Sequence, residues 1–466
     1  MRLVTLFSPR GTIDRAPYFF LGLALVLAKL ATDAALSLAV FHQPWRPEEY
    51  LWLQFSVARW ERNPASFLFV LTMLTVAAPF AWIGVCLTTQ RLRAMRAPIW
   101  LVLILFAPFL KFFLFALLCL LPSQPARESV APPLPPESVS GFRRWIPDSA
   151  LGSALLAVAV SASLGCGFVA LAVFGLGHYF SGLFVGAPFG LGFIAALLHN
   201  ARRSRTLGQS IGVALLAMLV IAIALLAIAI EGAVCLLMAA PLAVCLAVAG
   251  AVVAHALLGS MRRHQIGVLM SVTALLPLLL LVEKQASLPP PIFAVTSEIV
   301  VAAPPDKVWP HVIGFAQIAP PNELIFRAGV AYPVRAVIDG RGVGAIRHCI
   351  FSTGEFVEPI TVWQEPAHLA FDVAAQPDPL QELSPYRALH TAHLSGYFKS
   401  VRGEFRLRAL GADRTLLQGT TWYSDRVEPQ IYWRLWSDFL IHRIHQRVLD
   451  HIRRETETAP QTAASR

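Results

Sequence analysis

Residues 150–282 carry almost no charge, and this feature constrains the fold of the chain more than any other. A soluble protein has roughly 25% charged residues, whereas the whole of this chain has 14%. A stretch this long and this apolar cannot be solvated by water, so we expect it to lie in lipid. Its charged residues are Arg202, Arg203, Arg205, Glu231, Arg262 and Arg263.

Apolar runs of about 20 residues, the length that crosses a bilayer core, recur through the first 282 residues. No signal-peptide cleavage site follows the first run, so we expect a retained anchor. Proline-rich sequence between the third and fourth runs favours an extended linker. The runs are 17–40, 67–87, 98–121, 150–176, 180–199, 207–230, 233–258 and 266–282.

This pattern predicts a multi-pass α-helical membrane protein with a C-terminal α+β domain. The net charge of +10 comes from scattered arginines without interleaved aromatic residues, which argues against nucleic-acid binding. The six cysteines form no CxxC spacing, so neither disulfides nor zinc are expected. The predicted parts are an N-terminal membrane domain (1–125), a proline-rich linker (126–149), a five-helix membrane domain (150–284), a short linker (285–292), the α+β domain (293–456) and a disordered tail (457–466).

The distribution of arginine in the short loops bears on topology. If all eight runs crossed with the N-terminus inside, Arg202–Arg205 and Arg262/Arg263 would lie outside, against the positive-inside tendency. The third run contains Pro108 and Lys111 near its middle, and a re-entrant third run would place every arginine cluster inside. On this count we expect the C-terminal domain to be extracytoplasmic.

Two segments of the N-terminal region carry a family resemblance. "LFSPRGTIDRAPYFF" at the start and "QRLRAMRAPIW" before the third run resemble a bacterial inner-membrane family, domain of unknown function 805, for which no activity is known. Thr12 replaces a usual arginine, and "RAM" stands where the family has a histidine and an aspartate. The matching residues are Phe7, Ser8, Gly11, Arg15, Arg91, Leu92 and Pro122.

Lys29 and Asp33 lie four residues apart within the first apolar run. This spacing places them on one helix face, where they can neutralise each other. Intramembrane charges are often functional, but an internal ion pair is the simpler expectation here.

From Phe293 onward the hydrophobic pattern changes to a period of two, which is typical of strands. "EIVVAAPPDKVWPHV" predicts a first strand followed by a short helix, and "GTTWYSD" predicts a last strand that leads into a long helix over 429–454. The other strands are predicted over 334–338, 343–351, 356–364, 369–375 and 398–410.

This element order resembles the helix-grip fold of the START, polyketide cyclase/dehydrase and Bet v 1-like superfamily. The resemblance implies a curved antiparallel sheet wrapped on the last helix, with apolar molecules bound between them. Catalytic residues vary among such proteins, and none is carried over to this sequence.

The last helix carries an apolar stripe that we expect to face the sheet. His442 and His445 on this helix are three residues apart and could touch one metal ion, but no third ligand accompanies them, so histidines on a polar face, with no metal and no cofactor, are expected. The stripe consists of Trp433, Trp436, Leu440, Ile441, Ile444, Val448 and Ile452.

Strand alternation places a charged pair on the inner face of the sheet. A four-residue turn "STGE" would pair Phe351 with Phe356 and Cys349 with Glu358, which leaves Arg347 diagonal to Glu358. Such a pair could orient the headgroup of a ligand; the alternatives are a structural ion pair, or a register error that puts both residues outside. The predicted ligand-binding residues are Arg347, Cys349, Phe351, Glu358, Ile360, Phe371, Phe405, Trp436, Leu440 and Ile444.

The segment "QPDPLQELSPYRALHTAHLSGYF" is long for a hairpin, and it is expected to be a lid, a membrane-contacting loop or a disordered insertion. His390, His393 and Tyr397 supply this segment with polar and aromatic side chains.

The sequence thus predicts a membrane-tethered module that binds or transfers a hydrophobic small molecule or lipid. The alternatives are a cyclase-like or hydrolytic enzyme that uses Glu358 as acid/base, or a protein-interaction or envelope-stress module. Oligomeric state is left open.

Overall fold

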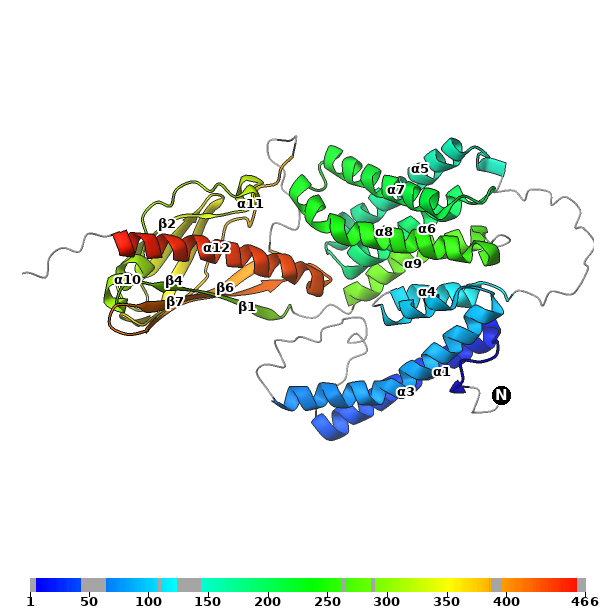
Figure 1. Ribbon diagram of the computed structural model, residues 1–466, viewed down its shortest axis with the longest axis horizontal. Helices are drawn as coiled ribbons and strands as arrows, with labels where there is room; N and C mark the ends of the chain where they lie inside the picture. Colours follow the sequence, from blue (N-terminus) through cyan, green and yellow to red (C-terminus); the bar gives the residue numbers. More distant parts are fainter. Residues whose placement is uncertain are drawn as a thin grey trace, which may run out of the picture. The chain divides into compact units, whose positions relative to one another are not determined.

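The computed structural model describes residues 6–42, 64–107, 110–123, 144–261, 265–285, 290–384, 386 and 396–458. Most of the two predicted linkers, and the predicted tail from residue 459, lie outside these residues. The chain divides into two compact units, which are taken separately below: Met1–Leu225 with Ala239–Ser287, and Leu226–Met238 with Leu288–Arg466 (Figure 1).

The first unit is built from long apolar helices. Among the described residues, seven helices are long and apolar enough to cross a membrane, because a bilayer core of about 30 Å requires about 20 residues. The chain is therefore an integral membrane protein, and the predicted multi-pass helical class is confirmed. The helices are α1 (Arg15–Phe41), α3 (Pro64–Ala94), α5 (Ala150–Ala170) continued by η5 (Leu171–Leu176), η6 (Gly182–Gly186) continued by α6 (Ala187–His199), α7 (Leu207–Ala227), α8 (Ala233–Met261) and α9 (Gln265–Gln285).

The third apolar run is not one continuous helix. It forms a 3₁₀ helix, η3 (Ile99–Phe106), and a short α-helix, α4 (Leu110–Leu120); residues 108 and 109 lie outside the described residues. Each piece is only about 16 Å long at about 2.0 Å per 3₁₀ residue and 1.5 Å per α residue. Neither piece alone is long enough to span a bilayer.

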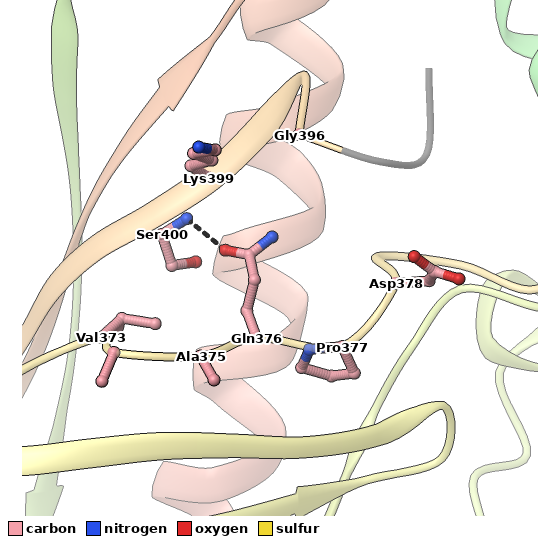
Figure 2. A pocket seen from close by; sticks show the side chains of 9 residues that line it. Val373, Ala375, Gln376, Pro377, Asp378, Gly396, Lys399 and Ser400 are labelled. Atoms are coloured by element: carbon pink, nitrogen blue, oxygen red, sulfur yellow. Dashed lines mark hydrogen bonds between the residues drawn. The ribbon is translucent and has the colours of Figure 1, made fainter. Parts of the chain in front are cut away.

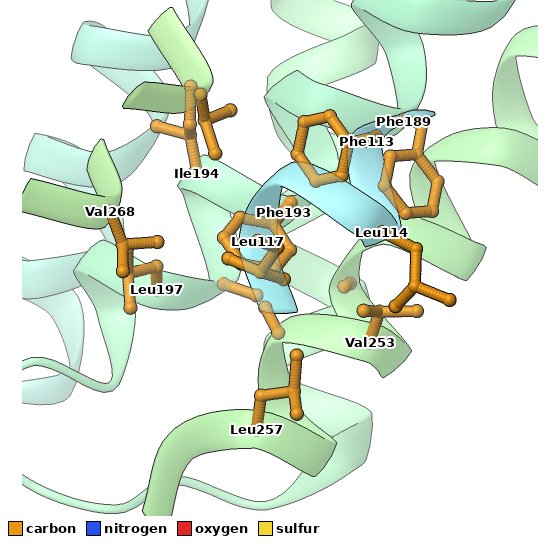
Figure 3. Close-up of a cluster of buried hydrophobic side chains, with 14 of the residues drawn as sticks. Phe113, Leu114, Leu117, Phe189, Phe193, Ile194, Leu197, Val253, Leu257 and Val268 are labelled. Atoms are coloured by element: carbon orange, nitrogen blue, oxygen red, sulfur yellow. The ribbon is translucent and has the colours of Figure 1, made fainter. Parts of the chain in front are cut away.

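Helix α4 packs against the fully buried helix α6 through Phe113 (Figure 3). The Phe113 ring meets the Phe189 and Phe193 rings edge-on, with centroids 5.0 and 5.7 Å apart. Helices α6 and α8 approach closely at glycines, which have no side chain to keep two helix backbones apart: a Cβ on Gly192 would lie 2.2 Å from the Ala247 carbonyl oxygen.

The two halves of the N-terminal motif hold each other in place. The side chains of Trp82 and Gln90 donate to the carbonyls of Phe7 and Ser8, at 3.1 and 2.7 Å. Arg91 is fully buried and donates to the carbonyls of Leu118 (2.9 Å), Ile13 (3.3 Å) and Leu121 and to Ser123 Oγ (2.8 Å). Arg91 thus caps the carbonyl end of α4.

In α1, Lys29 and Asp33 form the ion pair expected from their spacing. Asp33 is buried and Lys29 is mostly buried, so each charge lies beside its counter-ion within the apolar run.

The C-terminal domain is a seven-stranded antiparallel sheet in the order β1-β7-β6-β5-β4-β3-β2 with a long terminal helix, α12 (Gln430–Thr458). Helix α12 runs along the sheet, with α10 (Pro305–Ile313) and α11 (Leu324–Arg327) beside it (Figure 1). The predicted α+β class is confirmed, and the elements follow one another along the chain in the predicted order: a strand, short helices, six antiparallel strands and a long helix. The strands are β1 (Ile292–Val301), β2 (Pro333–Asp339), β3 (Ile346–Phe351), β4 (Gly354–Gln364), β5 (His368–Asp372), β6 (Phe398–Ala409) and β7 (Thr415–Asp425).

Apolar side chains from the sheet, α10 and α12 fill the space between these layers. Trp309 of α10, for example, is buried and meets Trp363 edge-on at 5.8 Å. This cluster comprises Val301, Ala303, Val308, Trp309, Val312, Phe315, Ile318, Ala336, Ala345, Cys349, Ile360, Leu369, Phe371, Leu407, Leu417, Val448, Leu449 and Ile452.

Candidate functional site

The β3–β4 hairpin places Arg347 directly opposite Glu358. Phe351 pairs with Gly354, so the turn contains two residues rather than the four predicted, and the predicted diagonal register is wrong by two positions. Gly354 adopts a positive φ of 150°, which glycine tolerates. Strand β4 can therefore begin at Gly354 rather than at the predicted Phe356. A shift of two residues preserves the face, so both charges still point inward.

Arg347 and Glu358 form a buried ion pair. Their side chains are 2% and 7% exposed, and Arg347 Nη1 donates to Glu358 Oε2. Arg347 Nε also donates to the Ile313 carbonyl at 3.2 Å. Burial raises the pKa of the Glu358 carboxyl, and the guanidinium beside it acts in the opposite direction.

Three phenyl rings surround the guanidinium of Arg347. Its central carbon lies 5.6, 5.2 and 5.7 Å from the ring centroids of Phe315, Phe371 and Phe405. Such contacts are favourable where the cation is desolvated. The pair is therefore enclosed by the packed interior of the domain rather than open to a cavity.

The structure brings five predicted site residues together around this pair: Arg347, Cys349, Glu358, Phe371 and Phe405. Burial raises the pKa of the Cys349 thiol to about 12, so it is a neutral packing group. Nearby, Ile360 is buried, and the half-buried Phe351 packs on Phe356 with ring centroids 4.7 Å apart.

On α12, the predicted residues Trp436, Leu440 and Ile444 are half-buried. The centre of the buried face is formed instead by Trp433, Ser437, Ile441, Val448, Leu449, His451, Ile452 and Thr456.

His442 and His445 face the sheet, so the expectation that they lie on a polar face is wrong. Both Nδ1 atoms lie within hydrogen-bonding distance of Ser297 Oγ in β1, at 2.7 and 3.1 Å. His445 Nε2 is 2.8 Å from Thr421 Oγ1 in β7. Burial lowers the pKa of His445 to about 4, with a contribution from His442. In the described part of the chain, no three or more His, Cys, Asp or Glu side chains gather as metal ligands.

A second polar cluster lies between β7 and the start of α12. Tyr423 Oη donates to Asp438 at 2.5 Å, and Ser437 Oγ donates to Asp425 at 3.1 Å. Burial raises the pKa of Asp425 to about 6, against hydrogen bonds from Val427 and Ser437. Together with the histidines, this cluster fixes how α12 lies on the sheet.

A pocket of about 430 Å³ opens where β5 and β6 separate (Figure 2). The two strands pair from His368 to Asp372, and the Val373 N–H still donates to the Val401 carbonyl at 3.0 Å. Beyond Val373 the chain turns towards β4, where Ala375 bridges to Val357. The pocket is lined by Val373, Ala374, Ala375, Gln376, Pro377, Asp378, Gly396, Lys399 and Ser400.

The side chain of Gln376 spans the gap between the separated strands. Its Oε1 accepts from the Ser400 backbone N–H at 2.7 Å (Figure 2). Its Nε2 donates to the Phe398 carbonyl at 2.9 Å. The side-chain amide thus replaces the missing backbone pairing of β6 and holds the pocket open at a defined width.

None of the predicted ligand-binding residues lines this pocket. We did not single out Gln376, Lys399 and Ser400 from the sequence, because 369–375 and 398–410 were treated as strands and the strand pattern gave no sign of where the two separate. The signal in the sequence was the long segment that starts at Gln376, which we expected to be a lid, a membrane-contacting loop or a disordered insertion. Within that segment, Pro385, His390 and His393 lie outside the described residues.

Comparisons with known proteins give a family for the N-terminal region alone. No curated protein matches the chain. Among solved structures, a Streptomyces sp. R1128 aromatase/cyclase is 18% identical and matches with a TM-score of 0.26, over 38% of this chain and 100% of its own. A norcoclaurine synthase mutant from Thalictrum flavum is 14% identical, with a TM-score of 0.25, over 37% of this chain and 98% of its own. Residues 6–130 match the family model described as protein of unknown function DUF805, which confirms the resemblance expected for 1–125.

Proposed function

We propose that this chain is a membrane-anchored binding or transfer module for a hydrophobic small molecule or lipid. The observation that carries the proposal is the pocket of about 430 Å³ between β5 and β6, a volume within the usual range of small-molecule sites. Because the chain is an integral membrane protein, apolar molecules are concentrated next to the domain.

The chemistry of the pocket suits an amphipathic ligand. Val373, Ala374 and Pro377 give it apolar surface, while Lys399 and Asp378 add opposite charges. Lys399 is exposed and would pair with an acidic group of the ligand.

The predicted site around Arg347 and Glu358 lies apart from this pocket, whose lining contains neither residue. A ligand headgroup would reach this pair only if the packed interior opened, because the two side chains are 2% and 7% exposed. The enzyme alternative needs the same opening, since an acid/base must come within about 3 Å of the proton it transfers.

A second candidate is a protein-interaction module. The interior of the domain favours this candidate, because the domain's own side chains fill it. A domain that binds a large ligand would have a cavity there. On this alternative the outer surface of the domain, rather than a pocket, carries the function.

We propose the bacterial inner membrane as the location, with the C-terminal domain extracytoplasmic. The match of residues 6–130 and the arginine distribution support this placement. A reporter that is active only in the cytoplasm, fused after Arg466, should stay inactive; an active fusion would contradict the placement.

The binding proposal is tested by releasing the domain from the intact protein. A protease site inserted at 286–289 allows the full chain to be purified from membranes and cleaved, and the released domain to be weighed by native mass spectrometry. We expect a retained apolar adduct, and we expect Gln376→Ala to lose it. Gln418→Ala is the matched control, because Gln418 bonds Glu298 on the exposed sheet surface. A folded domain without any adduct would favour the protein-interaction candidate.

A further inference from the structure

An apolar stripe on α12 is left exposed at the beginning of the helix. Ile431, Leu435 and Phe439 are 68%, 69% and 47% exposed, and their spacing of four residues places them on one helix face. The next two positions in this series are Arg443 and Arg447. The exposed apolar stripe therefore covers only the first turns of α12, because Arg443 pairs with Glu323 and Arg447 donates to the carbonyls of Pro333 and Ala319.

These first turns lie at the end of the domain where the membrane tether enters. Ile292, the first residue of β1, pairs with Ser424 at the end of β7, and α12 begins soon afterwards at Gln430. The guanidinium of Arg434 lies 4.8 Å from the ring centroid of Phe293. The start of α12 and the start of β1 are therefore direct neighbours.

The tether is short. Helix α9 ends at Gln285 and β1 begins at Ile292, and seven steps along the chain cover at most about 25 Å. The neighbouring start of α12 therefore stays within reach of the bilayer that holds α9.

We propose that the first turns of α12 dock on the surface of the bilayer in which the chain is anchored. Ile431, Leu435 and Phe439 would insert at the boundary between headgroups and acyl chains, as apolar faces of interfacial helices do. Arg426, exposed just before α12, would lie among the phosphates. The occupant of the stripe is phospholipid.

The test uses the full-length chain in vesicles of phosphatidylethanolamine and phosphatidylglycerol at 3:1. A benzophenone-bearing residue replaces Leu435, and in a matched control it replaces Arg454, which is exposed on the same helix about 28 Å further along. After irradiation, mass spectrometry identifies the molecule attached to the probe. We expect phospholipid at position 435 and little or none at 454.

The other outcomes overturn the proposal. Attachment to a peptide from residues 6–285 of the same chain would mean that the stripe docks on the protein's own helices. Attachment to a second copy, recognised by mixing nitrogen-15-labelled and unlabelled chains, would mean a dimer interface. No attachment, or equal lipid attachment at both positions, would mean a free helix.

A second variant tests the apolar contacts themselves. Ile431→Gln with Phe439→Gln, in the chain that carries the probe at 435, should lower the lipid attachment by about 10-fold, since it removes two of the three inserted side chains. Unchanged hydrogen exchange in β4 would show that the domain remains folded. Undiminished lipid attachment in this folded variant would contradict the docking.

Discussion

Removing one partner of the Arg347–Glu358 pair should destabilise the C-terminal domain strongly. Arg347→Met leaves the carboxylate of Glu358, 7% exposed, without its counter-ion, and breaking a buried pair in this way costs about 3–5 kcal/mol. The apolar double variant, Arg347→Met with Glu358→Leu, removes both charges. It should recover most of that loss and leave about 1 kcal/mol for the Ile313 carbonyl, which loses its donor.

Hydrogen exchange of the full chain in nanodiscs measures this loss. Strands β3 and β4 belong to the packed core, so their amides exchange through large-scale unfolding. A loss of about 3–5 kcal/mol accelerates their exchange by about 150- to 4,000-fold. The double variant should stay within about 10-fold of the native protein.

Arg341 and Glu365 supply the matched control. They form an exposed ion pair, with side chains 77% and 44% exposed, and such pairs contribute little. Arg341→Met should therefore leave exchange in β3 and β4 almost unchanged. The reasoning is refuted if Arg347→Met behaves like this control, or if the double variant is as unstable as the single one.

Four further predictions follow from other contacts. Gln376→Ala should accelerate exchange of the Ser400 amide by about 10-fold or more, because two hydrogen bonds across the strand separation are lost; an unchanged rate would contradict the bridging role. The pKa of His445 is lowered to about 4. The contribution of this side chain to the stability of the domain is therefore complete above about pH 6.5, its ordinary pKa, and is lost as the pH falls towards 4. In urea denaturation, the stability of His445→Gln should fall less with acid than that of the native protein. The pKa of Asp425 is raised to about 6. The contribution of this carboxyl to the stability of the domain is therefore complete below about pH 4 and is lost as the pH rises through 6. Asp425→Asn should stabilise the domain at pH 7 by about 2 kcal/mol, and a loss of stability would argue against the raised pKa. Arg91→Ala should lower the thermal stability of the membrane unit in detergent, while Arg203→Ala, an exposed arginine, should not.

The fold could be predicted because its signals are periodic. Apolar runs of helical length and strands with a period of two each repeat over many residues, so a small error at one end does not change the class. The inward direction of Arg347 and Glu358 survived a wrong turn length for the same reason, because a shift of two positions preserves the face.

The pocket could not be predicted because it depends on where pairing stops. Whether β5 and β6 separate after Val373 depends on the competing partner Val357 and on the side chain of Gln376, and neither contact is periodic. His442 and His445 were misplaced because polar residues on a helix are expected outside, whereas Ser297 and Thr421 on the sheet give them hydrogen-bond partners inside.

The most direct test of ligand binding at the strand separation is hydrogen exchange of the released domain, before and after its bound molecule is extracted. The account predicts that extraction accelerates exchange in residues 373–378 and 396–400 and leaves β2 and β3 unchanged. A domain that carries no molecule would contradict the account. So would a change centred on Arg347 and Glu358, because it would place the ligand in the interior of the domain.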